Sequence, residues 1–150
     1  MVLGTSSGAG KSWISTALCR WYARQGYKVA PFKAQNMSNN ARVVHSRQSL
    51  ATESSFADQA CGEIGSAQYF QALAAHAVPN VNMNPVLLKP ETDTRSQVIL
   101  LGKVNSELSA TPWRERSKKI WPCIQQSLDY LIADNDVVVM KVRAHQLKLI

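Results

Sequence analysis

The spacing of apolar positions predicts a chain that alternates strands and helices. A short apolar stub at residues 1–3 precedes a loop of small residues, and a helix is expected over residues 11–25, ended by Gly26. Its apolar face is expected to be formed by Ile14, Ala17, Leu18 and Trp21. Residues 28–32 (KVAPF) predict a second strand. Strand, glycine loop, helix and strand in this order predict a βαβ unit with parallel strands.

The same kind of pattern continues after one interruption. Residues 33–61 are polar and without a clear period, so we expect a long loop there. Beyond it the pattern predicts a helix at 62–77, a turn at 78–84, strands at 85–88 and 97–101, a helix at 111–133 and a strand at 136–140. The last helix has Thr111 as a hydroxyl cap, Pro112 at its first position and a kink or restart at Pro122. The strand at 136–140 (DVVVM) is expected to be fully buried in a parallel sheet.

The loop between the stub and the first helix carries the strongest chemical signal. It reads Gly4-Thr5-Ser6-Ser7-Gly8-Ala9-Gly10-Lys11-Ser12, a phosphate-binding loop (P-loop) with five residues, where four are usual, between its outer glycines. Glycines leave backbone N–H groups open to an anion, and the helix N-terminus adds further donors. Thr5, Ser6, Gly8 and Gly10 would line the nucleotide phosphates, Lys11 would reach the β- and γ-phosphates, and the Ser12 hydroxyl would ligate Mg²⁺. The predicted fold class is therefore α/β, a P-loop three-layer α/β/α arrangement with a mostly parallel, incomplete sheet.

Composition narrows the classes of partner. The 150 residues are 45% hydrophobic and 18% charged, which is typical of a globular protein, and no apolar run is long enough to span a membrane. The net charge of +7 is not taken as a nucleic-acid signal. The one dense basic group has Glu115 interleaved and is expected to be a solvated helix face; it comprises Arg114, Arg116, Lys118 and Lys119.

The three cysteines have no metal-like spacing and are expected to be buried thiols; they are Cys19, Cys61 and Cys123. Since no leader sequence is evident, we expect a cytoplasmic protein.

Four ordered blocks resemble one family. The loop resembles that of the dethiobiotin synthetase and cobyric acid synthase group, and residues 30–40 (APFKAQNMSNN) resemble the segment after the second strand of cobyric acid synthases. Residues 62–75 and 83–90 are similar to the next helix and the substrate-side strand of that family. Together they identify the chain as a member of the cobyric acid synthase family, N-terminal synthetase domain.

The resemblance implies an ATP- and Mg²⁺-dependent reaction. These synthases amidate carboxylate side chains of a corrin ring in cobalamin synthesis, with ammonia released from glutamine by a C-terminal glutaminase domain. Phosphorylation turns a carboxylate oxygen into a leaving group, so the protein mainly positions groups and neutralises charge. The resemblance makes Lys11 and Lys33 catalytic candidates and places substrate contacts at Gln35, Asn36, Asn84 and Lys89. The implied partners are the corrin and the ammonia source, with no nucleic acid and no membrane.

The sequence departs from the family in two places. Residues 45–60 have no recognisable counterpart. After Met140 the family continues Glu-Gly-Ala-Gly-Ser-Pro-Ala-Glu-Ile-Asn, and restoring one nucleotide before a back-translated Lys141 reproduces that segment. We therefore expect residues 1–140 to be a partial ATP-binding synthetase domain, residues 141–150 to be an out-of-frame tail, and the glutaminase domain to be absent. Such a chain would bind ATP weakly and would not amidate.

Two alternatives remain open. A cobyrinic acid diamide synthase or a dethiobiotin synthetase-like ligase would share the loop, but the Gln35-Asn36-Met37 segment argues against both. A partitioning-type P-loop ATPase would be a nucleotide-switched binding module. Such ATPases usually carry a lysine early in the loop, where this chain has Ser6.

Overall fold

Parallel strands at the centre of the structure are formed by the apolar segments that the pattern predicted. The computed structural model describes the chain except residues 5, 7, 46–60, 93–94 and 143–150. β1 (Val29–Phe32) pairs in parallel with β8 (Val137–Met140). On the other edge of β8 the stub forms a parallel bridge between Val2 and Lys141, in which the Val2 N–H donates to Met140 O at 2.7 Å. The predicted βαβ unit is confirmed, with β8 between the stub and β1.

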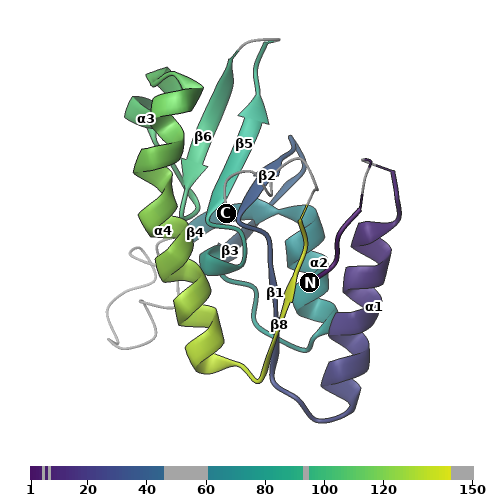
Figure 1. Ribbon diagram of the computed structural model, residues 1–150. Helices are drawn as coiled ribbons and strands as arrows, with labels where there is room; N and C mark the ends of the chain where they lie inside the picture. The colour runs from purple at the N-terminus through teal and green to yellow at the C-terminus, as the bar shows by residue number, and fades with distance from the viewer. Residues whose placement is uncertain (5, 7, 46–60, 93–94, 143–150) are drawn as a thin grey trace.

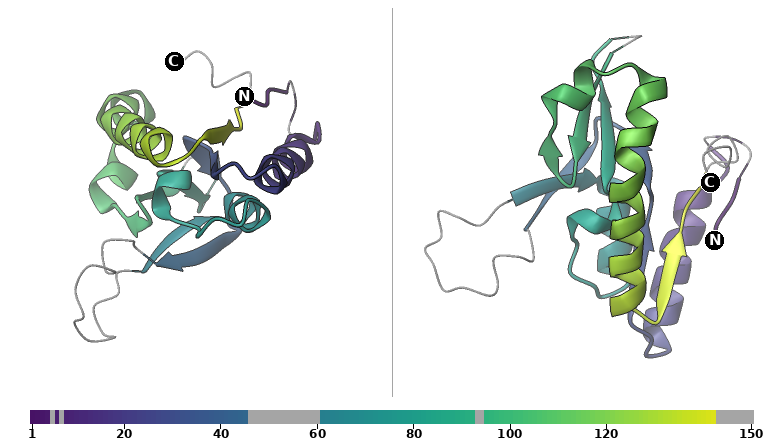
Figure 2. Two further views of the ribbon diagram at one scale, coloured as in Figure 1. Left: turned by 90° about the horizontal axis from the view of Figure 1, so that it is seen from below. Right: turned by 60° about the vertical axis from the view of Figure 1, so that its left-hand side comes forward.

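Helices cover both sides of this parallel unit. α1 (Lys11–Arg24) and α2 (Ser66–Ala74) pack against each other and against β1 on one side. The long α4 (Trp113–Asp134) lies on the other side, as Figure 1 and the left view of Figure 2 show. The α/β class and its three layers are thus confirmed. β8 is less buried than expected, since only Val139 of its four residues is fully buried.

The buried face of α1 differs from the predicted one. Ile14 and Trp21 are 53% and 55% exposed, whereas Ser15 and Cys19 are fully buried. Cys19 packs with Val29 of β1 and Val139 of β8. Small side chains let the helix approach the strands closely. The predicted face is therefore wrong for Ile14, Ala17 and Trp21, whereas Leu18 is partly buried against the same cluster.

The predicted long loop contains regular structure. β2 (Gln35–Met37) pairs in parallel with β5 (Val86–Pro90), and β3 (Ala41–His45) pairs antiparallel with β4 (Cys61–Gly65). The predicted helix at 62–77 was therefore wrong in its first part, and α2 begins only at Ser66. These strands carry polar residues and glycines rather than an alternating pattern, which is why the sequence did not reveal them. The segment without a family counterpart lies outside the described residues except for β3's His45.

Two antiparallel strands extend the sheet that β2 and β5 begin. β5 pairs with β6 (Ser96–Leu100), and β6 pairs with β7 (Lys103–Val104). A short 3₁₀ turn, η2 (Val81–Met83), leads into β5, near the predicted turn. The larger core cluster joins these strands to β1, α4 and α3 (Ser106–Ala110); its most buried members are Ala30, Ala72, Val86, Val98 and Leu131.

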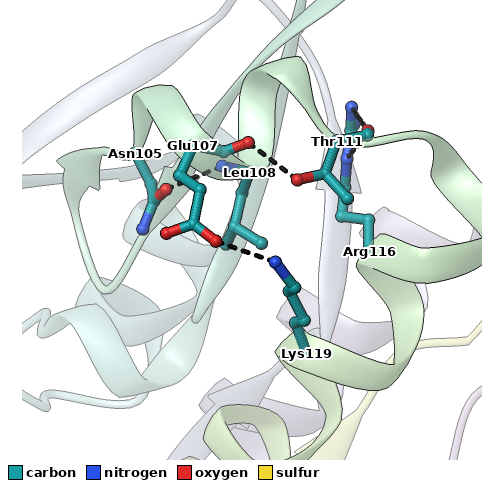
Figure 3. A network of polar contacts seen from close by, with 6 residues as sticks. All are labelled: Asn105, Glu107, Leu108, Thr111, Arg116 and Lys119. Carbon is teal, nitrogen blue, oxygen red and sulfur yellow. Dashed lines mark hydrogen bonds and ion pairs between the residues drawn. The ribbon is translucent and has the colours of Figure 1, made fainter.

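The junction of α3 and α4 is held by polar contacts that replace the predicted cap (Figure 3). Thr111 does not cap α4: its hydroxyl donates to Glu107 O at 2.8 Å. The Arg116 side chain is only 8% exposed and donates to Thr111 O at 2.8 Å. Arg116 is thus an exception to the predicted solvated basic face. α4 also continues through Pro122 without a restart.

Candidate functional site

The phosphate loop forms a turn at the N-terminus of α1. Gly10 has φ +73°, a conformation that glycine adopts without strain, and its N–H donates to Gly8 O at 2.8 Å. No side chain caps α1, and its first turn holds no acidic residue. The helix N-terminus is therefore able to attract an anion. Of the predicted phosphate-lining residues, Thr5 lies outside the described residues.

Lys11 lies across the loop. Its side chain is 5% exposed, and its ammonium donates to the carbonyl oxygen of Ser6. The aliphatic stem passes over Gly4, where an added Cβ would lie 2.8 Å from Lys11 Cδ. Gly4 is therefore needed for this close approach. The ammonium is held inside the loop, at the place where a phosphate oxygen could take over from the Ser6 carbonyl.

Ser12 has a basic rather than an acidic neighbour. Its hydroxyl accepts a hydrogen bond from the ammonium of Lys141, the residue after β8. Lys141 is fixed by its backbone, since its N–H donates to Phe32 O at 3.0 Å and it bridges Val2. Among the described residues no group of three or more His, Cys, Asp or Glu side chains lies close enough to hold a metal ion. The predicted Mg²⁺ ligand is thus in contact with a cation of the chain itself.

Lys33 follows β1 at the same end of the parallel strands. Its ammonium donates to Asn36 Oδ1, and its N–H donates to Met83 O at 3.0 Å. Because Phe32 is paired with Met140, Lys33 and Lys141 extend neighbouring strands beyond the same point. Asn36 is buried on β2, and Gln35 beside it is half-buried. The structure therefore brings Lys33 and Asn36 together, as a substrate contact would require.

Asn84 is committed to holding strands and helix together. Its Oδ1 accepts from Gly65 N at 2.9 Å, and its Nδ2 donates to the carbonyls of Lys33 and Val86, each at 3.0 Å. The side chain is only 1% exposed. This use of its hydrogen bonds favours a structural role for Asn84 over the predicted substrate contact.

Three amide side chains meet over Gly65, and we call them the amide cluster: Asn36, Gln68 and Asn84. A Cβ on Gly65 would lie 2.1 Å from Asn36 Nδ2, 2.9 Å from Gln68 Oε1 and 3.1 Å from Asn84 Oδ1. Gln68 is fully buried, and its amide has no hydrogen-bond partner among the residues that the structure describes. Sequence reasoning missed Gln68, because an amide in an alanine-rich helix has no distinctive local spacing.

α2 connects the amide cluster to the phosphate loop. Gln71 lies one helical turn after Gln68, and its Nε2 donates to Ser12 O at 3.4 Å. Both side chains are almost completely buried. Ser15 of α1 is also fully buried, and its hydroxyl has no partner in the described part of the chain. The contact between α1 and α2 is thus polar at the end that carries the loop.

Lys89 is placed differently from the other candidates. It lies on β5 one residue beyond Leu88, the last partner of β2, and forms an ion pair with Glu63 of β4. The structure does not join it to Lys33 or to the loop by any contact among the described residues. The Lys89 side chain thus links β5 to β4 through its ion pair with Glu63.

The cysteines occupy different environments. Burial raises the pKa of the Cys19 thiol to about 12, and desolvation also raises the pKa of Cys123. Cys61 is exposed, which contradicts the prediction that all three are buried. In the part of the chain that the structure describes, no helix is long and apolar enough to cross a membrane.

The fold and this site define a P-loop nucleotide-binding domain of the α/β class. Comparison with known families agrees, since residues 1–145 match the CobQ/CobB/MinD/ParA nucleotide binding domain. The chain belongs to this family.

Relatives narrow the position of the chain within the family. It is 67% identical to the cobyric acid synthases of Variovorax paradoxus and a Polaromonas species, and 65% identical to that of Methylibium petroleiphilum. Each match covers 94% of this chain but only 25–26% of the relative. The chain thus spans about a quarter of the length of the curated relatives it matches. No solved structure matches it.

Proposed function

We propose that this chain contributes the ATP-binding part of a cobyric acid synthase, which amidates corrin side-chain carboxylates with ammonia derived from glutamine. The observation that carries the proposal is the convergence at one end of the parallel strands. The loop follows the stub, Lys33 follows β1, and Lys141 follows β8. The similarity to relatives named cobyric acid synthase supports the choice of reaction.

The loop side would bind the triphosphate. The uncapped N-terminus of α1 and the ammonium of Lys11 both lie at the phosphate loop. There they would stabilise negative charge on the transferred phosphoryl group. Ser6, Gly8 and Gly10 would supply backbone contacts, and Thr5 remains a candidate from sequence alone. Lys11 would then exchange its Ser6 carbonyl for a phosphate oxygen.

The Lys33 side would bind the acceptor. Its ammonium, now on Asn36 Oδ1, would neutralise a corrin carboxylate, and Gln35 and Asn36 would hold it by hydrogen bonds. A carboxylate oxygen attacks the γ-phosphorus and ADP leaves. Ammonia then attacks the acyl carbon, and phosphate leaves with the carboxylate oxygen. The ammonia would come from glutamine hydrolysed by a glutaminase domain of the whole enzyme.

Magnesium accompanies ATP in most P-loop enzymes, and the sequence assigns it to Ser12. The described residues do not fit that ion well, because a lysine contacts the Ser12 hydroxyl and no acidic cluster is near. We therefore derive no step through the metal for this chain.

Calorimetric titration tests the proposal. ATP should bind the chain with weak affinity, and a corrin acid with free side-chain carboxylates should then bind to the ATP-loaded chain. The matched control ligand is the same corrin with those side chains amidated, which should not bind. Because the chain spans only about a quarter of its relatives' length, we expect no amide product from ammonium salts.

Two outcomes would decide against this function. Binding of ATP without any binding of corrin acids would favour the partitioning-type ATPase. Absence of nucleotide binding would argue against both the synthase and the ATPase. Lys33→Met should abolish corrin binding while leaving ATP affinity unchanged; an equal loss of both would argue against a separate acceptor side.

A further inference from the structure

The contact between Lys141 and Ser12 has a consequence for metal dependence. In P-loop proteins the hydroxyl that follows the lysine ligates Mg²⁺, which offsets the charge of the nucleotide phosphates. Here that hydroxyl accepts a hydrogen bond from an ammonium group of the same chain. A dication on the same oxygen would lie within a few ångströms of this positive charge and would be repelled by it.

The position of Lys141 is set by the sheet. Its N–H donates to Phe32 O at 3.0 Å on one side, and on the other side it bridges Val2, with the N–H of Val142 donating to Val2 O at 3.1 Å. The backbone therefore holds the side chain at the loop end of β8, next to the first turn of α1. Because β8 lies between two parallel neighbours, Lys141 cannot leave Ser12 by a simple shift of its backbone.

The described residues around the loop show no acidic cluster. The first turn of α1 holds no acidic residue, and no cluster of metal-ligating side chains exists among the described residues. Lys11 adds a second ammonium on the loop, bonded to Ser6 O. Two lysines and the helix N-terminus thus present positive charge to whatever binds here.

We propose that Lys141 is a built-in cation that takes the place of the divalent metal at Ser12, so that the loop binds the phosphates of a nucleotide without Mg²⁺. This inference rests on the proposed function, because it assumes that the loop binds a nucleotide. The expected ligand is then free ATP rather than the magnesium complex of ATP, because the four negative charges of free ATP are better matched by the two lysines.

The test measures ATP affinity of the 150-residue chain by calorimetry, once in excess EDTA and once in excess Mg²⁺. The unchanged chain should bind ATP at least as tightly in EDTA as in Mg²⁺. Lys141→Gln keeps a polar group beside Ser12 without its charge, and should bind ATP about tenfold more weakly in EDTA, with recovery in Mg²⁺. Lys141→Glu should bind ATP only when Mg²⁺ is present.

Lys118→Glu is the matched control. It reverses one charge at an exposed position of α4, on the other side of the sheet from the loop helix, and should leave the metal dependence unchanged. Circular dichroism checks that each variant is folded; should Lys141→Glu fail to fold, the neutral Lys141→Gln still decides.

Three results would overturn the inference. A requirement of the unchanged chain for Mg²⁺ refutes the built-in cation and leaves nucleotide binding standing. The same follows if Lys141→Gln has the same metal profile as the unchanged chain. No ATP binding under either condition refutes the proposed function, and the inference with it.

Discussion

The phosphate loop and the amide cluster differ in the space around their glycines. Both hold polar side chains close to backbone turns at one end of the molecule. In the loop, Gly8 and Gly10 are exposed, and an added Cβ at either would meet nothing within 4 Å. In the amide cluster, Gly65 is enclosed by Asn36, Gln68 and Asn84. The loop thus has room for an external partner, whereas the cluster has none at Gly65, and the Asn84 amide is already bonded to backbone groups of Gly65, Lys33 and Val86.

The largest effect is expected from filling the cluster. Gly65→Ala would place a Cβ 2.1 Å from Asn36 Nδ2 and disturb the bond from Gly65 N to Asn84 Oδ1, so we expect a loss of about 3 kcal/mol in unfolding free energy. Gly8→Ala makes the same chemical change in open space and should alter stability by less than about 0.5 kcal/mol. Urea denaturation measures both, and equal losses would contradict the comparison.

A loop substitution should affect binding and spare the fold. Lys11→Met keeps an unbranched stem over Gly4 but removes the ammonium from Ser6 O, so ATP affinity should fall by about 10- to 100-fold. The urea midpoint should stay close to that of the unchanged chain. Lys118→Met is the control for the loss of one positive charge. If Lys11→Met unfolds the chain or leaves ATP binding intact, the loop is not the site described.

The thiols test whether the loop helix is seated on its strands. With a pKa of about 12, Cys19 has only about one thiolate in ten thousand molecules at pH 8, and its side chain is fully buried between α1 and β1. Iodoacetamide labelling followed by peptide mass spectrometry should therefore modify exposed Cys61 and leave Cys19 unlabelled until urea is added. Labelling of Cys19 as fast as Cys61 in the folded chain would mean that α1 is not packed as described.

The same contrast explains what the sequence could and could not predict. The loop, α1 and the strands β1 and β8 were predicted because their signals are local: glycines before a Gly-Lys-Ser turn, and short apolar runs. The amide cluster joins residues that lie 16 to 48 positions apart, and polar residues in short strands have no period. The exposed face of α1 was missed because helix periodicity marks apolar positions, whereas close packing here selected the small residues Ser15 and Cys19.

The smallest effect on stability is expected from the exposed ion pair between Glu107 of α3 and Lys119 of α4 (Figure 3). It provides a reference value against which the loop and the amide cluster are compared. The pKa of Glu107 is lowered mainly by the hydrogen bond from Lys119 and, to a smaller extent, by the positive charge of Lys119. The same contact raises the pKa of Lys119. Both side chains are exposed to solvent, so water and salt screen their attraction. Glu107→Gln should therefore shift the urea midpoint far less than Gly65→Ala, and the shift should vanish at high salt.

The pH dependence of this ion pair has a definite sign. A lowered carboxyl pKa stabilises the fold above the ordinary Glu value of 4.5, and this contribution is lost as the pH falls through the lowered value. A raised lysine pKa stabilises the fold below 10.5 and is lost as the pH rises through the raised value. The difference between the unchanged chain and Glu107→Gln should therefore be greatest between these limits and absent in acid. A difference that persists in acid would show that Glu107 acts through packing rather than charge.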